Sequence, residues 1–255
     1  MANNLLVLQS DFGLVDGAVS AMIGVALQEE PSLGVHHLTH DITPYNTFEA
    51  SYRLFQTVEY WPEGTTFVSV VDPGVGSSRK SVVALTKTGQ YIVTPDNGTL
   101  SYIKKVVGIV AVREISEVEN RRSNTELSYT FHGRDVYAYT GAKLASGHIS
   151  FEEVGPELPV DKILELPVVE TIIEDNLVRG AIDILDVRFG SLWTSITRDD
   201  FYALEPNFGD RFEVTIFNND MLVYQNQVTY GKSFAKAYNV GVGSNWHIEI
   251  KRLGD

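Results

Sequence analysis

Short apolar runs alternate with helix-like stretches along the first half of the chain. Leu5–Leu8 is a continuous apolar run, typical of a strand that is buried on both faces. Apolar residues then recur three or four positions apart between 18 and 26, the spacing of a helix, until Pro31 closes it. Further strands are expected at 36–42, 66–71, 81–85 and 91–94, and further helices at 48–60 and 131–145. This alternation predicts an α/β domain with a central, largely parallel sheet flanked by helices.

The pattern changes near residue 168, where helical periodicity becomes scarce. Short segments of alternating polarity replace it, at 178–186, 192–196, 211–217, 222–225 and 246–251. This pattern predicts a small all-β domain, either a barrel or a sandwich. We therefore expect an α/β domain at residues 1–168 and an all-β domain at residues 169–255.

Composition narrows the function classes. The chain has 255 residues, of which 44% are hydrophobic, as in ordinary globular proteins. Its 20 Lys and Arg against 33 Asp and Glu leave a net charge of −13, which repels nucleic acid phosphates but not a cationic small molecule. The absence of cysteine excludes disulfides, thiolate nucleophiles and Cys-ligated metals. The apolar runs are too short for a membrane span or a signal peptide, so we expect a cytoplasmic protein without nucleic acid or membrane partners.

Three polar residues, Ser10, Asp11 and Asp16, surround the start of the first expected helix. One interpretation is structural, because Ser10 or Asp11 is a suitable helix cap. The other is functional, because an ionised carboxylate only accepts hydrogen bonds and therefore suits a ribose diol or an amine. The sequence leaves both interpretations open.

The segment from Asp72 to Arg79 is the most informative loop. Pro73 constrains the turn, and glycines at 74 and 76 permit positive φ angles or a close approach of backbone to ligand. The loop brings a carboxylate and a guanidinium together, either as a surface ion pair or as part of a site. It does not match the full pattern of a phosphate-binding loop, which argues against nucleoside triphosphates.

His132, followed by Gly133, opens the last expected helix of the α/β domain. As a lone histidine it is either a solvated residue or, if the fold brings it to the Asp72 loop, a catalytic group. Gly133 permits the tight approach of something bulky.

Another histidine group is the candidate metal site: His36, His37 and His40, followed by Asp41. The segment is predicted to be a strand, and no cysteine completes a ligand set. We prefer hydrogen bonding at a strand end, and we expect no metal.

Two aromatic side chains of the all-β domain, Phe189 and Tyr230, suit stacking on a flat ring. The alternative is that both belong to the core of that domain.

Five motifs together resemble one family. They are Ser-Asp-Phe-Gly at 10–13, Asp-Pro-Gly-Val-Gly at 72–76 followed by Arg79, Pro-Asp-Asn-Gly at 95–98, Phe-His-Gly-Arg-Asp at 131–135 and Asp-x-x-Phe-Gly at 186–190. In this order they resemble the S-adenosyl-L-methionine (SAM) hydrolases that form adenosine, also called SAM hydroxide adenosyltransferases. These are relatives of the bacterial fluorinases and chlorinases. The resemblance extends from Leu5 to about Gly254.

The resemblance implies an α/β N-terminal domain, a β-barrel C-terminal domain and a homotrimer. SAM, the substrate, would lie where the N-terminal domain of one subunit meets the C-terminal domain of its neighbour, with no cofactor. The catalytic set of the family falls on Asp72, Arg79 and His132. The other substrate contacts fall on Asp11 and Tyr45 (ribose), Asp16, Asp186 and Ser244 (methionine), Phe189 and Tyr230 (adenine faces), Arg252 and Gly254 (adenine edge), and Gly133 and Ser191. Ser191 and Asn245 stand where the halogenases carry Asn and Arg.

These residues favour water over halide as the nucleophile. In-line attack at ribose C5′ expels a neutral sulfur, so the reaction needs a positioned water rather than a metal. A carboxylate at Asp72 repels fluoride or chloride, which favours hydroxide transfer. Two alternatives stay open: a SAM- or adenosine-binding protein without turnover, and a weak halogenase-type transferase.

Overall fold

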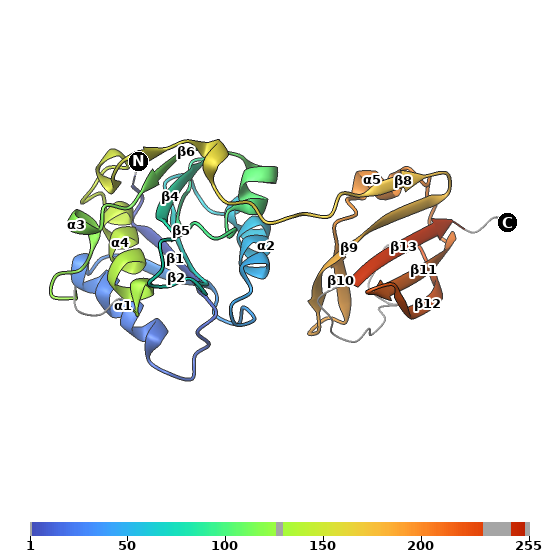
Figure 1. Ribbon diagram of the computed structural model, residues 1–255, viewed down its shortest axis with the longest axis horizontal. Coiled ribbons are helices and arrows are strands. Elements are labelled where there is room, and N and C mark those ends of the chain that lie inside the picture. Colours follow the sequence, from blue (N-terminus) through green and yellow to red (C-terminus); the bar gives the residue numbers. More distant parts are fainter. Residues whose placement is uncertain (1, 126–129, 232–245, 253–255) are drawn as a thin grey trace. The chain divides into compact units, whose positions relative to one another are not determined.

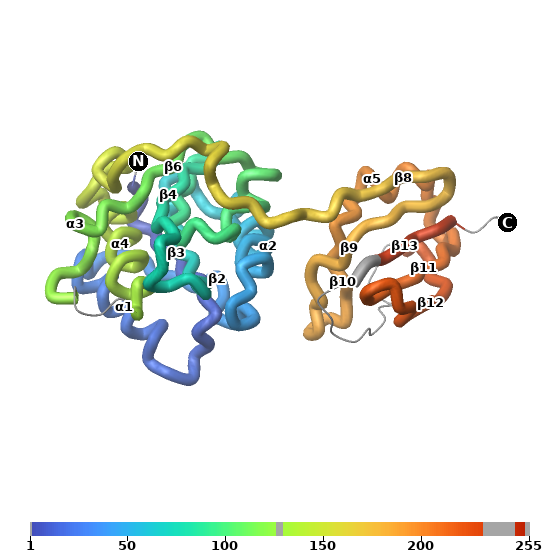
Figure 2. Tube along the Cα trace, viewed as in Figure 1, coloured from blue at the N-terminus to red at the C-terminus, as the bar shows by residue number. Residues whose placement is uncertain are grey.

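The computed structural model describes residues 2–125, 130–231 and 246–252. The chain divides into two compact units, Met1–Leu166 and Pro167–Asp255 (Figure 1). The colours of Figure 2 show that each unit is one continuous stretch of sequence, so each is described by itself. No helix in these ranges is both long and apolar enough to cross a membrane.

A seven-stranded mixed sheet forms the centre of the first unit, in the order β2-β1-β3-β5-β4-β6-β7. Its strands are β1 Leu5–Ser10, β2 Gly34–Thr39, β3 Thr66–Val70, β4 Ser81–Thr86, β5 Tyr91–Pro95, β6 Ile109–Glu114 and β7 Glu157–Leu158. The first four strands in this order pair in parallel, whereas β4 pairs antiparallel with both neighbours and β6 pairs antiparallel with β7.

The expectation of a largely parallel sheet therefore holds for one half only and is corrected to a mixed sheet. The physical reason is the connection between β4 and β5, a tight turn in which Gly89 has a φ of 86°. A connection this short joins only antiparallel strands. Strands β6 and β7 were not anticipated from the sequence.

Helices cover both faces of this sheet. They are α1 Ala18–Glu29, α2 Thr47–Val58, α3 Glu117–Asn120 and α4 Tyr139–Ser146, with π-helices η1 Ile103–Val107 and η2 Gly133–Ala138 and 3₁₀ turns η3 Glu152–Val154 and η4 Val160–Lys162. Figure 1 shows α1 and α4 on one side of the sheet and α2 on the other. Within β1, Leu6 and Leu8 join the core with Met22 of α1, and Val7 joins the core with Leu54 of α2. Burial on both faces explains the continuous apolar run of β1.

The helix expected at 131–145 consists of two parts. It starts as the π-helix η2 and continues as α4, which ends at Gly147 with a φ of 77°. π-Helical turns are rare and occur frequently at functional sites.

The second unit is built on an antiparallel sheet in the order β10-β9-β13-β11-β12, with β8 paired to β9. Its elements are β8 Ile172–Glu174, β9 Leu177–Asp186, β10 Ser191–Thr194, α5 Arg198–Tyr202, β11 Arg211–Asn218, β12 Met221–Thr229 and β13 Trp246–Arg252. Asn219 and Asp220 both have positive φ angles, which closes the β11–β12 hairpin tightly. Its core includes Val214, Ile216 and Ile248. An α/β unit followed by an antiparallel β unit agrees with the predicted fold class.

Candidate active site

The polar loops of the first unit meet at one edge of its sheet. Asp11 follows β1 and Asp72 lies two residues after β3, and these strands pair in parallel with Ser10 opposite Val70. From β1 the chain continues to β2 on one side, whereas β3 lies on the other side. The carboxyl edge at such a switch of strand order is where α/β sheets bind ligands.

Asp72 and Arg79 form a buried, two-pronged ion pair. Arg79 Nε donates to Asp72 Oδ1 at 2.9 Å, and Arg79 Nη2 donates to Asp72 Oδ2. The side chains are only 6% and 10% exposed. Burial alone would lower the pKa of Arg79, but the hydrogen bonds and charge of Asp72 outweigh it and raise that pKa. The guanidinium therefore stays charged and holds a carboxylate in one orientation.

His132 joins this pair from the start of η2. Its Nδ1 lies 3.0 Å from Arg79 Nη2, and the residue is buried. Burial lowers the pKa of His132, and the cations Arg79 and Arg121 lower it further, against the opposing effect of Glu117 and Asp72. The imidazole is therefore neutral near pH 7 and is able to accept a proton. The structure thus brings Asp72, Arg79 and His132 into one hydrogen-bonded cluster.

The hydroxyl groups of Ser81 and Tyr137 hydrogen-bond to the cluster. Arg79 Nη1 donates to Ser81 Oγ at 2.9 Å, and this oxygen lies 3.1 Å from the Tyr137 hydroxyl. Tyr137 also donates to Asp72 Oδ2 at 3.5 Å. Burial raises the pKa of Tyr137, so its hydroxyl stays protonated. Sequence reasoning missed Tyr137. It follows His132 by about one turn of the helix expected at 131–145, so its closeness to His132 along that helix was a usable signal.

Arg121 is the second residue that sequence reasoning missed. Its Nη2 lies 2.9 Å from Nε2 of His132, on the opposite edge of the ring from Arg79. The i,i+4 spacing of Glu117 and Arg121 allows an ion pair within a helix, and in the structure Arg121 Nη2 lies 2.6 Å from Glu117 Oε2. Nothing local in the sequence connects this pair to His132.

The two carboxylates of the first polar loop, Asp11 and Asp16, both accept hydrogen bonds from backbone N–H groups. Asp16 accepts a hydrogen bond from the backbone N–H of Ala18 at 2.8 Å and thereby stabilises the start of α1. Asp11 accepts from the backbone N–H of Tyr45, an exposed residue with a φ of 65°. The interpretation of Ser10 or Asp11 as the helix cap is wrong, because α1 begins only at Ala18.

Gly133 is packed against the protein itself. A Cβ at this position would lie 3.1 Å from Val70 Cγ1 and 3.3 Å from the ring of Phe12. The missing side chain therefore lets η2 approach the ends of β1 and β3, where the cluster lies.

The histidine group at the end of β2 forms a hydrogen-bonded chain. Ser10 Oγ lies 2.7 Å from His40 Nδ1, and His40 Nε2 lies 2.8 Å from His37 Nδ1. His36 instead packs against Trp61. Within the described ranges, no three His, Asp or Glu residues are arranged to hold a metal ion.

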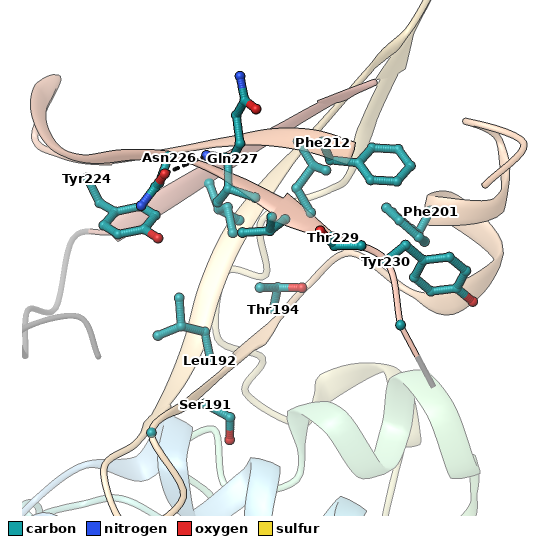
Figure 3. A pocket seen from close by; sticks show the side chains of 16 residues that line it. Ser191, Leu192, Thr194, Phe201, Phe212, Tyr224, Asn226, Gln227, Thr229 and Tyr230 are labelled. Carbon is teal, nitrogen blue, oxygen red and sulfur yellow. Dashed lines mark hydrogen bonds between the residues drawn. The ribbon is translucent and has the colours of Figure 1, made fainter. Parts of the chain in front are cut away.

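The second unit contains a hollow of about 750 Å³ (Figure 3). Ser191 of β10, Phe201 of α5 and Tyr230 after β12 line it, together with Leu192 and Thr194. The hollow is mixed in character, with apolar side chains beside hydroxyls and amides, as in many sites for small organic ligands.

The remaining predicted contacts in this unit have internal partners or are exposed. Trp193 Nε1 donates to Asp186 at 3.3 Å, and Phe189 is 75% exposed on the turn after β9. Tyr230 stacks on Phe208 with ring centroids 5.0 Å apart. Arg252 donates to Asp210 at 3.0 Å. Ser244 and Gly254 lie outside the described residues.

The fold and the cluster define an α/β protein with a buried acid–guanidinium–imidazole group at the carboxyl edge of parallel strands. The family model described as the SAM hydroxide adenosyltransferase N-terminal domain matches residues 6–155. The chain belongs to this family, which confirms the resemblance predicted from its motifs.

Named relatives fall into two groups. The chain is 34% identical over 201 residues to "(R)-S-adenosyl-L-methionine hydrolase" from Methanocaldococcus jannaschii, covering 77% of this chain and 68% of the relative. It is 36% identical to the protein of that name from Thermus thermophilus, covering 74% and 73%. It is also 25% identical to a fluorinase from Actinopolyspora mzabensis, covering 97% and 90%.

A solved structure is similar over almost the whole chain. An uncharacterised conserved protein from Thermotoga maritima superposes with a TM-score of 0.86 at 30% identity, covering 97% of this chain and 100% of that one.

Proposed function

We propose that this protein is an enzyme that hydrolyses SAM to adenosine and L-methionine through attack of water at ribose C5′. The observation that carries the proposal is the buried cluster of Asp72, Arg79 and His132 at the switch point of the sheet. The SAM hydrolase names of relatives at 34–36% identity support it.

The reaction is a single displacement. A lone pair of the water oxygen forms the C5′–O bond while the C5′–S bond breaks. The electron pair of the broken bond stays on sulfur, which leaves as the neutral thioether of methionine. The water gives one proton to a protein base, and the base then releases this proton to solvent. Because the leaving group is neutral, the protein has to position the water and remove its proton.

Asp72 and His132 orient the water and accept its proton, while Arg79 holds the Asp72 side chain in place with two hydrogen bonds. Positioning of this kind contributes on the order of 7–11 kcal/mol. Proton removal adds about 10²–10⁴-fold in rate. A neutral His132 has the protonation state that this role requires.

The same chemistry argues against halide. A carboxylate with 6% exposure faces the site of the nucleophile, and its charge disfavours a fluoride or chloride ion there. The halogenase-type alternative is still tested directly, because fluorinase relatives cover most of the chain.

We propose the binding roles from the family pattern. Asp11 takes the ribose hydroxyls beside Tyr45, Asp16 and Asp186 face the methionine ammonium with Ser244 near its carboxylate, and Phe189 and Tyr230 hold the adenine, whose edge meets backbone near Arg252 and Gly254. Gly133 and Ser191 border the substrate. SAM needs no additional cofactor in this scheme.

We propose further that the C-terminal unit completes a barrel and that the enzyme is a cytoplasmic homotrimer with SAM at its subunit interfaces. The large exposure of Leu14 and Val15, next to the candidate site, supports a covering partner chain. Light scattering tests the homotrimer, and a monomeric mass would contradict it.

One chromatographic assay with purified protein and SAM separates the three candidate functions. Hydrolysis yields equal amounts of adenosine and methionine and no S-adenosylhomocysteine. A halogenase-type enzyme yields 5′-halogenated adenosine when excess halide is present. A binding protein consumes no SAM but is protected against heat by adenosine, and this outcome would overturn the proposal.

Variants test the roles of the cluster. Asp72→Ala, Arg79→Ala and His132→Ala should each abolish turnover while adenosine binding persists. His148→Ala is the matched control, because this exposed histidine pairs with Glu29 and not with the cluster. Near-normal rates in all three cluster variants would disprove the mechanism even if the products are as expected.

A further inference from the structure

The ring of His132 lies between two guanidinium groups. Arg79 Nη2 lies 3.0 Å from its Nδ1, and Arg121 Nη2 lies 2.9 Å from its Nε2. Each nitrogen of one imidazole thus faces a donor that always carries its hydrogens. Both distances are those of hydrogen bonds.

These two contacts compete for one lone pair. A neutral imidazole accepts at one ring nitrogen and carries a hydrogen on the other, and an imidazolium carries a hydrogen on both. A guanidinium accepts no hydrogen bond. At most one of Arg79 and Arg121 therefore donates to the ring at a time, and protonation of His132 would remove both hydrogen bonds.

Arg121 is held firmly in its position. Its side chain is 6% exposed, and its Nε and Nη2 donate to Glu117 Oε2 at 3.0 and 2.6 Å. The neighbouring Asn120 is fully buried and donates to the carbonyl of Val154 at 2.9 Å. The hydroxyl of Thr140, on α4, donates to the Asn120 carbonyl at 3.0 Å. Arg121 thus approaches His132 from a fixed segment.

We propose that Arg121, held by Glu117, is a positioning residue that sets the protonation and tautomer of His132. The inference rests on the proposed function for its catalytic meaning. The effect of Arg121 on the protonation of the His132 ring is measurable without substrate.

The charges around the ring determine the sign of the effect. Asp72 and Arg79 face it from the loop between β3 and β4, Glu117 and Arg121 face it from α3 and the residue after it, and the ring of Tyr137 contacts it from η2. Arg121 lowers the pKa of His132, whereas Glu117 raises it. Loss of Arg121 should therefore raise the pKa of His132, whereas loss of Glu117 should lower it.

The test is an NMR titration of the His132 ring in the full-length protein without SAM, with the resonance assigned by His132→Gln. Arg121→Met should move the His132 midpoint to higher pH, and Glu117→Gln should move it to lower pH. Arg122→Met is the matched control, because this neighbouring arginine bonds Gln28 instead of the ring. A purely structural role would move the first two variants the same way or not at all, and either result would overturn the proposal.

Ring nitrogen shifts and kinetics complete the design. Arg121→Lys retains the charge but replaces the planar guanidinium with a single ammonium group. It should leave the His132 midpoint nearly unchanged but alter the balance of the two ring tautomers. It should also lower kcat about 10- to 100-fold. The acid limb of the kcat/KM profile should follow the NMR midpoints of Arg121→Met and Glu117→Gln. If the NMR midpoints move as expected but the kinetic limb does not, the positioning role stands and the catalytic role of His132 in the proposed function fails.

Discussion

At the scale of single residues, the site is built around charges that folding stability alone does not favour. The side chains of Asp72 and Arg79 are only 6% and 10% exposed, and burying two charges costs solvation that their attraction only partly returns. Removing one partner of such a pair typically costs about 3–5 kcal/mol, whereas replacing both with apolar residues is often neutral. We therefore interpret the pair as a chemical device.

Gly133 provides a residue-scale prediction. Gly133→Ala places a Cβ 3.1 Å from Val70 and 3.3 Å from Phe12, so we expect the free energy of unfolding to fall by about 1–3 kcal/mol. Turnover should fall as well, because the neighbouring His132 shifts with η2. Urea denaturation measures the first effect and the SAM assay the second.

Gly24→Ala is the control for this change. It lies within α1 and has nothing within 4 Å of the added Cβ, so it should leave stability unchanged or raise it by up to about 1 kcal/mol. Equal effects of the two substitutions would contradict the packing argument.

At the scale of elements, parallel pairing of β1 with β3 carries Asp11 and Asp72 to a common edge, and the start of the π-helix η2 brings His132 to the Asp72–Arg79 pair. The neighbouring ends of β1 and β2 are joined by the hydrogen-bonded chain of Ser10, His40 and His37. Burial, and next the nearby His37, lower the pKa of His40 from 6.5 to about 4. This link between two strand ends therefore depends on pH.

The sign of that dependence follows from proton binding. Between pH 6.5 and about 4 the unfolded chain binds a proton on His40 that the folded protein does not. The corresponding stability is complete above pH 6.5 and is lost as the pH falls towards about 4, in total about 2–3 kcal/mol.

His40→Asn should therefore flatten the decline of unfolding free energy over this range. Urea titrations of both proteins at pH 4.5, 5.5, 6.5 and 8 measure it, and the pH 8 value isolates the loss of hydrogen bonds from the proton effect. Parallel pH profiles for the two proteins would show that His40 is not responsible.

At the scale of the whole molecule, net charge and substrate charge are complementary. The chain carries −13, whereas SAM with its sulfonium, ammonium and carboxylate carries a net positive charge. Attraction between them raises the association rate and is screened by salt, with a Debye length of about 30 Å at 0.01 M and 8 Å at 0.15 M.

We therefore expect kcat/KM to fall as NaCl rises from about 0.01 to 0.3 M, with kcat nearly constant. Initial rates at low and saturating SAM separate the two quantities. A neutral osmolyte of matched osmolarity is the control. A kcat/KM independent of salt would show that overall charge plays no part in capture of SAM.

Much of this protein was determined by the sequence alone. Burial on both faces requires a continuous apolar run, so β1 was visible as a strand, and β-branched residues marked β3. Helical spacing marked α1 and α2. The motifs at 72–76 and 131–135 indicated the family, and they contain Asp72 and His132 of the cluster.

Only the tertiary structure decided the direction of β4, β6 and β7 and the surroundings of His132. Local patterns report which residues are buried and hydrogen-bonded with near neighbours, but not the path of the chain between elements. His132 meets Arg79, 53 positions away, and Arg121, 11 positions away, only in the folded chain. The protonation of a buried imidazole depends on these distant charges, which no sequence window contains.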